Sequence, residues 1–205
     1  MAQRRMVLRI YAVYRTLFFE AAGVIAGVPP FDLLALERVR IYENGKDHKK
    51  LAAAETLTSW QSRWDSILVM KAQWTKRLIS NISVWFLRKH GEINHYMTQI
   101  LSGHGCFQAY LKKFKIILDD RCVYCKIEID TAEHTLFHCS RWAEDRASVY
   151  RNVRLSSTPD NMVSKMLENK IYWDAISNLM NIIMKTKLDD TVKSCVFQRQ
   201  SNTLM

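Results

Sequence analysis

Glycine and proline are scarce in this sequence. Only 6 glycines and 3 prolines occur among 205 residues, which argues against collagen-like, Pro/Gly-rich and other low-complexity chains. Internal repeats are missing as well. Because 48% of the residues are hydrophobic, the chain has enough apolar side chains to build an ordered globular core of one or two domains.

Long hydrophobic runs are also missing. The most apolar stretch, residues 17–31, contains Glu20 and two prolines. It is shorter than the roughly 20 residues that a membrane-spanning helix needs. We therefore expect neither a membrane-spanning helix nor a membrane partner.

Acidic residues do not occur before Glu20. The preceding segment contains Arg4, Arg5, Arg9 and Arg15, a composition that imitates a mitochondrial transit peptide. Its apolar residues, however, fall at helical spacing and form one stripe: Met6, Val7, Ile10, Tyr14, Leu17 and Phe18. We favour the second interpretation, an amphipathic helix with a basic face.

Acidic residues are outnumbered along the whole chain. The sequence has 30 Lys and Arg against 20 Asp and Glu, a formal net charge of +10 that no single tail explains. Phosphates neutralised by Lys and Arg release counterions and so supply affinity that does not depend on sequence. The charge therefore favours a polyanionic partner, RNA or DNA, although basic proteins without such a partner exist.

Cysteine occurs five times, at Cys106, Cys122, Cys125, Cys139 and Cys195. An odd number in a chain without a secretory signature is more typical of reduced thiols or metal ligands than of disulfides. We therefore expect an intracellular protein that is not secreted. Between the nucleus and the cytoplasm we favour the nucleus, a preference that does not depend on the cysteines.

The hydrophobic periodicity is helical, and the Gly and Pro residues lie where a helical protein would place its loops. We predict a mainly α protein, a helical bundle. The first helix is expected from about residue 5 to Gly23–Gly27. The others are expected near residues 30–43, 50–66, 92–101, 106–114, 141–152, 160–168 and 171–187, with a break at Leu188-Asp189-Asp190 and a frayed tail at 196–205.

Aromatic and basic residues alternate between positions 74 and 90. The segment contains Trp74, Lys76, Arg77, Trp85, Arg88, Lys89 and His90. Such a composition suits rings that stack on bases and cations that contact phosphate. The alternative is that the tryptophans belong to the core and the cations to a solvated helix face.

The segment RCVYCKIEIDTAEHTLFHC, residues 121–139, offers five possible metal ligands. Cys122 and Cys125 form a C-x2-C, His134 follows after eight residues and Cys139 after four more. A C-x2-C turn directs both thiolates to one point, and sulfur with imidazole selects Zn²⁺ over hard cations. We expect one structural Zn²⁺ in a small knuckle, a short β-hairpin plus helix, near residues 120–140. Buried thiols without metal are the alternative.

His138 competes with Cys139 for the fourth ligand position. Asp130-Thr-Ala-Glu133 matches a capping box, so a helix should begin there and carry His134 on its first turn. On an ideal helix His138 shares a face with His134, whereas Cys139 lies about 140° away. A helix that loosens at its last turn would let Cys139 approach, and a thiolate is the stronger ligand. The residues alone leave both ligand sets open.

Two aspartate pairs, Asp119-Asp120 and Asp189-Asp190, have the composition of a polymerase metal site. Such a site needs its pair on a β-hairpin together with a distant carboxylate, whereas these pairs lie in a linker and at the expected helix break. We interpret both as cap or linker residues. His104 and Cys106 could form a second metal pair, but the glycines beside His104 favour a simple turn.

Three stretches resemble a known family: residues 21–42, 74–114 and 122–142. Over about residues 10–187 the chain resembles the C-terminal region of the reverse-transcriptase polyprotein of arthropod non-LTR (LINE-type) retrotransposons, both jockey-like elements and those that insert in ribosomal DNA. The resemblance implies that residues 122–139 are the family's CCHC zinc motif, with ligands Cys122, Cys125, His134 and Cys139, and that His138 is not a ligand. Ser102-Gly-His-Gly105 corresponds to another family motif.

The resemblance also implies a domain organisation and a partner. Residues 1–45 would be helices that follow the polymerase thumb, 46–118 a helical aromatic/basic linker region with the Ser-Gly-His-Gly turn, 119–152 the zinc motif, and 153–205 C-terminal helices and tail. The partner would be template RNA or target DNA. The candidate contacts are Lys76, Arg77, Arg88, Lys89, His104, Lys112, Lys113 and Arg121.

The sequence lacks the aromatic-x-Asp-Asp motif of the polymerase palm and the family's endonuclease. We therefore expect a truncated reading frame with no catalytic activity of its own and no small-molecule substrate; the parent polyprotein would be an RNA-directed DNA polymerase. The leading hypothesis is a zinc-containing nucleic-acid-binding fragment. The alternatives are a module that docks on the polymerase, with Trp60, Trp64, Leu33 and Leu36 exposed, and a non-functional remnant.

Overall fold

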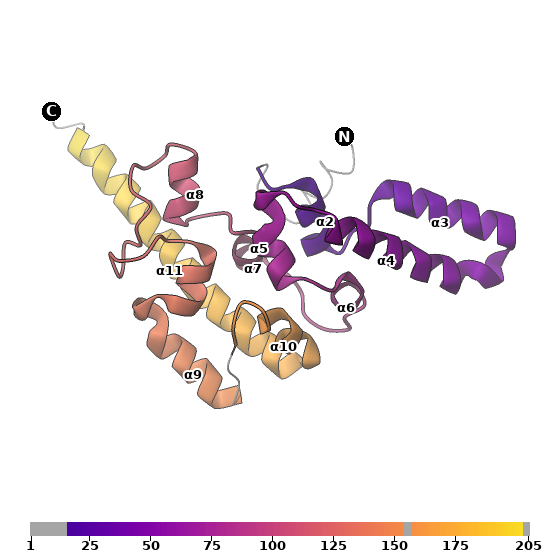
Figure 1. Cartoon of the computed structure of the whole chain (residues 1–205). Helices are drawn as coiled ribbons and strands as arrows, with labels where there is room; N and C mark the ends of the chain where they lie inside the picture. The colour runs from indigo at the N-terminus through magenta and orange to yellow at the C-terminus, as the bar shows by residue number, and fades with distance from the viewer. Residues whose placement is uncertain (1–15, 154–156, 203–205) are drawn as a thin grey trace.

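The structure, a computed structural model, describes residues 16–153 and 157–202 (Figure 1). These residues are mainly helical and contain no β-strand, which confirms the predicted fold class. The helices are α2 (Phe19–Ala26), α3 (Phe31–Asn44), α4 (Lys49–Asp65), α5 (Met70–Leu78), α6 (Ile82–Phe86), α7 (His95–Ser102), α8 (Gln108–Lys113), α9 (Ala143–Val153), α10 (Met162–Glu168) and α11 (Lys170–Asn202), with short turns η1 (Lys46–His48), η2 (His134–His138) and η3 (Ser140–Trp142).

Helix α2 lies at the centre of the core. Six consecutive residues, 21–26, are buried, and a helix that is apolar all round needs neighbours on every side. Gly27 ends α2 in the left-handed conformation, with φ 64°, and its N–H closes the last turn onto the carbonyls of Gly23 and Val24. The predicted helix from residue 5 does not run into α2, because residues 16–18 are not helical; residues 5–15 lie outside the described part of the chain.

Helices α3 and α4 form a hairpin that projects from the body (Figure 1). Helix α4 buries a stripe at four-residue spacing, Ala52, Thr56, Trp60 and Trp64. The indole N–H of Trp64 donates to the carbonyl of Ile79 at 2.8 Å. The expectation that Trp60, Trp64 and Leu33 are exposed is therefore wrong: they are 3%, 1% and 7% exposed. Only Leu36 of that set is exposed.

Helix α11 is the longest element and lies against α7, α9 and α10 (Figure 1). The predicted break at Leu188-Asp189-Asp190 is absent, since α11 continues to Asn202. Tertiary contacts hold these residues in the helix: Asp190 accepts a hydrogen bond from Tyr124 Oη at 2.9 Å, and Lys187 is 2% exposed. Local composition alone does not reveal either contact.

The buried side chains of the described residues form one cluster that extends from Leu17 to Met184. This core crosses the predicted boundaries at residues 45 and 118, and the four-region organisation stays a prediction. Within the described ranges no single helix is long and apolar enough to cross a membrane. Only α2 and α3 taken together, bent by 59° at their junction, have the length and composition for it.

Candidate metal centre

The loop that carries Cys122 and Cys125 closes on itself through the backbone. Cys122 N–H donates to the carbonyl of Glu128 at 2.8 Å, and Lys126 N–H donates to the carbonyl of Cys122 at 2.9 Å. Lys126 adopts a left-handed φ of 63°, which allows the tight reversal. The turn therefore directs both thiols to the same side of the loop.

The predicted β-hairpin is wrong in the described residues. One antiparallel bridge, between Arg121 and Ile129, is all that remains of it. The backbone groups between these residues close the turn around Cys122 and Cys125, so they are not available for a second rung of a ladder. The second half of the predicted knuckle, a helical segment carrying His134, is present.

The helical segment begins one residue later than the capping box predicted. The hydroxyl of Thr131 accepts the hydrogen bond from His134 N–H at 3.1 Å, so Thr131 is the cap. The carboxylate of Asp130 instead accepts the backbone N–H of Gln108 at 2.9 Å and the hydroxyl of Thr135 at 2.7 Å. Asp130 thus joins α8 to the metal motif.

The turn η2 is a π-helix, which is wider than an α-helix. Its defining hydrogen bond joins Cys139 N–H to the carbonyl of His134 at 2.7 Å. An i to i+5 bond places Cys139 above His134, whereas an ideal α-helix would hold the two about 140° apart. The sequence analysis considered a helix that loosens at its last turn. The structure has such a turn, and it brings Cys139 close to His134.

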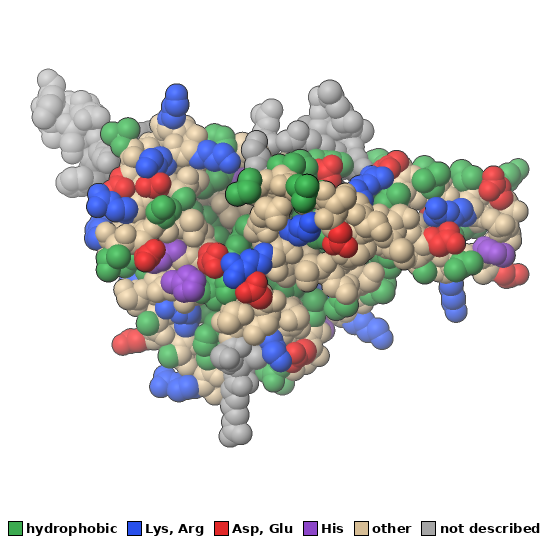
Figure 2. Space-filling view, in the orientation of Figure 1, with side chains coloured by type: hydrophobic (Ala, Val, Ile, Leu, Met, Phe, Trp, Pro, Cys, Tyr) green, Lys and Arg blue, Asp and Glu red, His purple; other side chains and the backbone are tan. Residues whose placement is uncertain are grey.

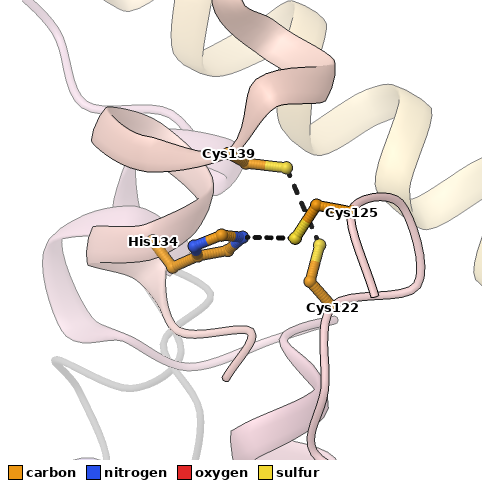
Figure 3. Close-up of side chains that lie close together, drawn as sticks. All are labelled: Cys122, Cys125, His134 and Cys139. Carbon is orange, nitrogen blue, oxygen red and sulfur yellow. Dashed lines mark hydrogen bonds between the residues drawn. The ribbon is translucent and has the colours of Figure 1, made fainter. Parts of the chain in front are cut away.

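The Cys122, Cys125, His134 and Cys139 side chains point toward a common centre (Figure 3). Their ligand atoms all lie within 4.8 Å of one another, so the group could hold a metal ion. The Sγ atoms of Cys122 and Cys139 are 3.7 Å apart, and Cys125 Sγ is 3.4 Å from His134 Nε2. A tetrahedral zinc with Zn–S near 2.3 Å and Zn–N near 2.0 Å needs separations of about 3.8 Å and about 3.5 Å. The cluster fits that geometry.

The environment favours the metal-binding forms of two members of the cluster. Backbone amides of Glu128 and Ile127 hydrogen-bond to the sulfur of Cys125 and lower the pKa of its thiol. Burial lowers the pKa of His134, which keeps the imidazole neutral. Burial raises the pKa of Cys139 to about 11, so a metal has to displace the proton of that thiol.

His138 lies outside the cluster. Its side chain is 59% exposed, and its Nε2 is 3.8 Å from the carboxylate of Glu133. The wide turn that brings Cys139 inward turns His138 outward. The four residues that the family resemblance implies as ligands are thus the four that the structure brings together.

A buried ion pair that was not predicted from the sequence joins the metal motif to α11. Lys187 Nζ lies 2.8 Å and 2.9 Å from the two carboxylate oxygens of Asp130. The ammonium also lies over the rings of Phe107 and Tyr124. The sequence did contain an indication that Lys187 is buried, because Lys187 follows Ile183 and Met184 at helical spacing on the buried stripe of α11.

Three of the four aspartates of the two pairs contact neighbouring side chains. Asp119 pairs with Arg121 at 2.9 Å, and Asp120 pairs with Lys112 at 2.9 Å. Asp190 accepts the hydroxyl of Tyr124, whose ring packs edge-on against Trp142. The metal-capable group found among the described residues contains neither His104 nor Cys106. The turn favoured for this stretch is present, since Gly103 and Gly105 adopt positive φ values of 68° and 122°.

The tryptophans of the aromatic/basic segment belong to the core. Trp85 is fully buried and donates its N–H to the carbonyl of Val24 at 2.8 Å. Trp74 is partly buried and donates to the carbonyl of Ile100 at 2.7 Å. A stacking role for Trp85 is therefore excluded by its burial, whereas the Trp74 ring still lines a pocket.

The four basic candidates of this segment have different surroundings. Lys76 donates to the carbonyls of Asp65 and Ile67 behind α4, and the guanidinium of Arg88 lies over the Trp85 ring, 4.3 Å from its centroid. Arg77 pairs with Glu133 at 2.8 Å and with Asp160 at 2.6 Å. Lys89 is exposed beside a cleft between α6 and α11.

The other four candidates lie around α8 and the metal motif. Lys112 and Arg121 pair with the neighbouring carboxylates described above, and Lys113 is exposed. Nδ1 of His104 is 2.7 Å from the carbonyl of Ser102. On the face shown in Figure 2, the described Lys and Arg side chains are scattered among Asp and Glu, without a single basic patch.

Fold and site together define a mainly helical basic protein with a Cys3His group that could hold a metal ion. The chain is 26% identical over 166 residues to the "Retrovirus-related Pol polyprotein from type-1 retrotransposable element R1 2" of Nasonia vitripennis. It is 25% identical over 169 residues to the corresponding R1 4 protein of the same species. The predicted resemblance to the polyprotein of a non-LTR retrotransposon is confirmed by these relatives.

The matched segments cover 71% and 70% of this chain but only 40% and 41% of the two relatives. The chain therefore corresponds to less than half the length of the curated relatives it matches. No protein-family model matches the chain, and no solved structure matches it significantly.

Proposed function

We propose that this chain is a zinc-stabilised, nucleic-acid-binding part of a retrotransposon reverse-transcriptase polyprotein, without catalytic activity of its own. The observation that carries the proposal is the Cys3His cluster in a chain of net charge +10 that is similar to Pol polyproteins. The partner would be template RNA or target DNA, and the place of action the nucleus.

The proposed metal is one Zn²⁺, held by Cys122, Cys125, His134 and Cys139. Three sulfurs and one imidazole nitrogen are the donor set that zinc prefers, and four protein ligands leave no coordination position for water. Such an ion is structural. The bound ion would connect the 121–129 loop to η2. In small zinc fingers a structural zinc contributes on the order of 10–16 kcal/mol to the free energy of folding.

The proposed nucleic-acid contacts rest on the placement of the basic candidates. Lys89 and Lys113 are exposed and can reach phosphate directly. Arg77, Lys112 and Arg121 already have carboxylate partners, so phosphate would have to compete for them. We therefore assign the main electrostatic contribution to Lys89 and Lys113.

A filter-binding titration with single-stranded RNA and DNA tests the proposal. Affinity should fall steeply between 50 mM and 200 mM salt, because each neutralised phosphate of a single strand contributes about 0.7 to the slope of log K against log salt. The double change Lys89→Gln and Lys113→Gln should reduce that slope by about 1.4. Lys46→Gln and Lys50→Gln, on the projecting hairpin, form the matched control. Absent or salt-insensitive binding would sink the proposal.

A second candidate function is docking on the polymerase part of the same polyprotein. Helix α3 supports it, since Phe31, Leu36, Val39 and Tyr42 are 43%, 49%, 48% and 89% exposed and only Leu33 of that helix is buried. If docking is the function, the isolated chain should bind a dye for exposed apolar surface and should not bind RNA. Val39→Glu should then reduce the dye signal.

A further inference from the structure

The Ser-Gly-His-Gly turn borders a pocket of about 350 Å³ that the metal cluster does not use. The pocket lies between α5, α8 and the start of the metal-motif helix. Its aromatic walls are Trp74, His104, Phe107 and Tyr110, and Lys113 and Glu133 supply charge. The pocket brings together Trp74 of the aromatic/basic segment, the glycine turn with the adjacent basic α8, and residues 131–133 of the metal motif.

The glycine turn keeps one wall of this pocket close to the Trp74 ring. Gly103 caps α7 in the left-handed conformation, with φ 68°, and a Cβ there would lie 3.3 Å from Trp74 Cδ1. Because the indole N–H is bonded to the carbonyl of Ile100 at 2.7 Å, the ring cannot move away freely. Gly103 therefore allows the turn to pack on a fixed aromatic surface.

Two further aromatic side chains of the lining, His104 and Tyr110, are also held in place. The rings of His104 and Tyr110 have centroids 4.8 Å apart, and Tyr110 packs in turn on Phe114 at 4.9 Å. The Tyr110 hydroxyl is 2.7 Å from the hydroxyl of Thr16. These rings are tilted to one another by 54° and 53°. Aromatic side chains held in this way offer ring faces on which a flat ligand can stack.

The charge around the pocket favours an anionic ligand. Lys113 lies at the lining, and Lys112 and Lys115 are its exposed neighbours. The one acidic side chain of the lining, Glu133, is paired with Arg77 at 2.8 Å. Its charge is thus largely compensated, whereas Lys113 is placed to meet a phosphate.

We propose that this pocket receives one unstacked base of a single-stranded nucleic acid, with Lys113 on the adjacent phosphate. The inference rests on the proposed nucleic-acid binding and gives it a specific site. The volume lies at the lower end of the range of about 300–1,000 Å³ for small-ligand pockets, which suits one nucleoside. A duplex keeps its bases paired and stacked and cannot offer one without the cost of flipping it out.

The test uses the full chain with zinc bound and a 12-nucleotide strand that carries one 2-aminopurine, made as RNA, as DNA and as the duplex. Stacking of the probe base on the aromatic walls should change its fluorescence on binding. Ala109→Leu fills the pocket from α8 without altering charge; Ala54→Leu, on the exposed face of α4, is the matched control. Ala109→Leu should weaken single-strand binding about tenfold, within the effect of one stacked base, with zinc content unchanged.

A second variant guards against a folding defect in the first. Lys113→Gln changes an exposed side chain and should weaken single-strand binding several-fold more than Lys46→Gln. The RNA and DNA strands then show which polymer the pocket takes. If the unmodified chain binds no nucleic acid, the proposed function fails and the pocket assignment with it. If the unmodified chain binds with salt dependence, two results overturn only the pocket assignment. One is that Ala109→Leu and Lys113→Gln bind the single strand as tightly as the unmodified chain. The other is that the unmodified chain binds the duplex as tightly as the single strand.

Discussion

Lys187 and Asp130 form an ion pair in which both side chains are almost fully buried, with 2% and 0% exposed. Asp130 lies four residues before the candidate ligand His134, and Lys187 lies on α11. The carboxylate also accepts hydrogen bonds from Gln108 and Thr135. One carboxylate therefore connects α8, α11 and the metal motif.

Removal of one partner from this pair should destabilise the fold strongly. Lys187→Met leaves the Asp130 charge buried without its counter-ion, which costs about 3–5 kcal/mol in the free energy of unfolding. Urea denaturation of the zinc-bound protein measures the loss. Lys185→Met, at an exposed position of the same helix, should change it by less than about 0.5 kcal/mol.

The double change Lys187→Met and Asp130→Asn completes the cycle. The neutral amide removes the unpaired charge while it keeps an acceptor for Gln108 N–H, so part of the loss should be recovered. If the loss of unfolding free energy in the double variant equals the sum of the losses in the two single variants, the two groups do not interact.

Zinc binding should depend on the four residues of the cluster and not on the neighbouring His138. The protein should contain one zinc per chain, measured by atomic emission after gel filtration. His134→Ala and Cys139→Ser should lose the ion and lower the melting temperature, because each removes a donor atom from the cluster. His138→Ala, at an exposed position beside it, should keep both values. Retention of zinc by Cys139→Ser together with loss by His138→Ala would show that the ligand set is wrong.

Gly91 should tolerate no side chain, for a reason beyond its backbone conformation. Gly91 and Gly45 share a φ of 86°, but a Cβ on Gly91 would lie 2.2 Å from the Trp173 ring and one on Gly45 would meet nothing within 4 Å. Gly45→Ala should cost about 1–3 kcal/mol of backbone strain. Gly91→Ala should cost about 1–3 kcal/mol more through the clash. Equal effects in thermal unfolding would contradict the close approach of Trp173.

His104 should make the protein less stable below neutral pH. Burial lowers the pKa of its imidazole, and the charge of Lys113 acts in the same direction. The unfolded chain therefore takes up a proton at about pH 6.5, where the folded one does not. This contribution to stability is complete above pH 6.5 and is lost as the pH falls from there toward the lowered pKa.

Denaturation at pH 7.5, 6.5 and 5.5 measures this effect. His104→Gln cannot titrate, so it should lose less stability than the unmodified protein over the same range. His134 is also buried with a lowered pKa, which is why the variant has to be compared with the unmodified chain at each pH. If the unfolding free energies of the two proteins fall equally as the pH is lowered, His104 is not the source of the pH dependence.

Local patterns predicted most of the helices. Gly27 and Gly45 end α2 and α3 as their sequence context indicates, and α4, α7 and α8 begin and end within three residues of the expected bounds. These features depend on caps, breakers and apolar spacing within a few residues, and such short-range effects can be read from the chain. The predicted break after Lys187 failed because partners 57 and 66 residues away, Asp130 and Tyr124, hold the helix together.

By itself the sequence determined the helical class, the spacing of the four possible ligands and the relationship to retrotransposon polyproteins. The residues alone left Cys139 and His138 open as the fourth ligand, and the family resemblance implied Cys139. The tertiary structure supplies the physical reason, a π turn that an ideal helix does not contain. It also decided that Trp60, Trp64 and Trp85 are core residues and that Trp74, His104 and Lys113 share one pocket. Composition is a property of each segment, whereas burial and pocket walls depend on which segments pack together.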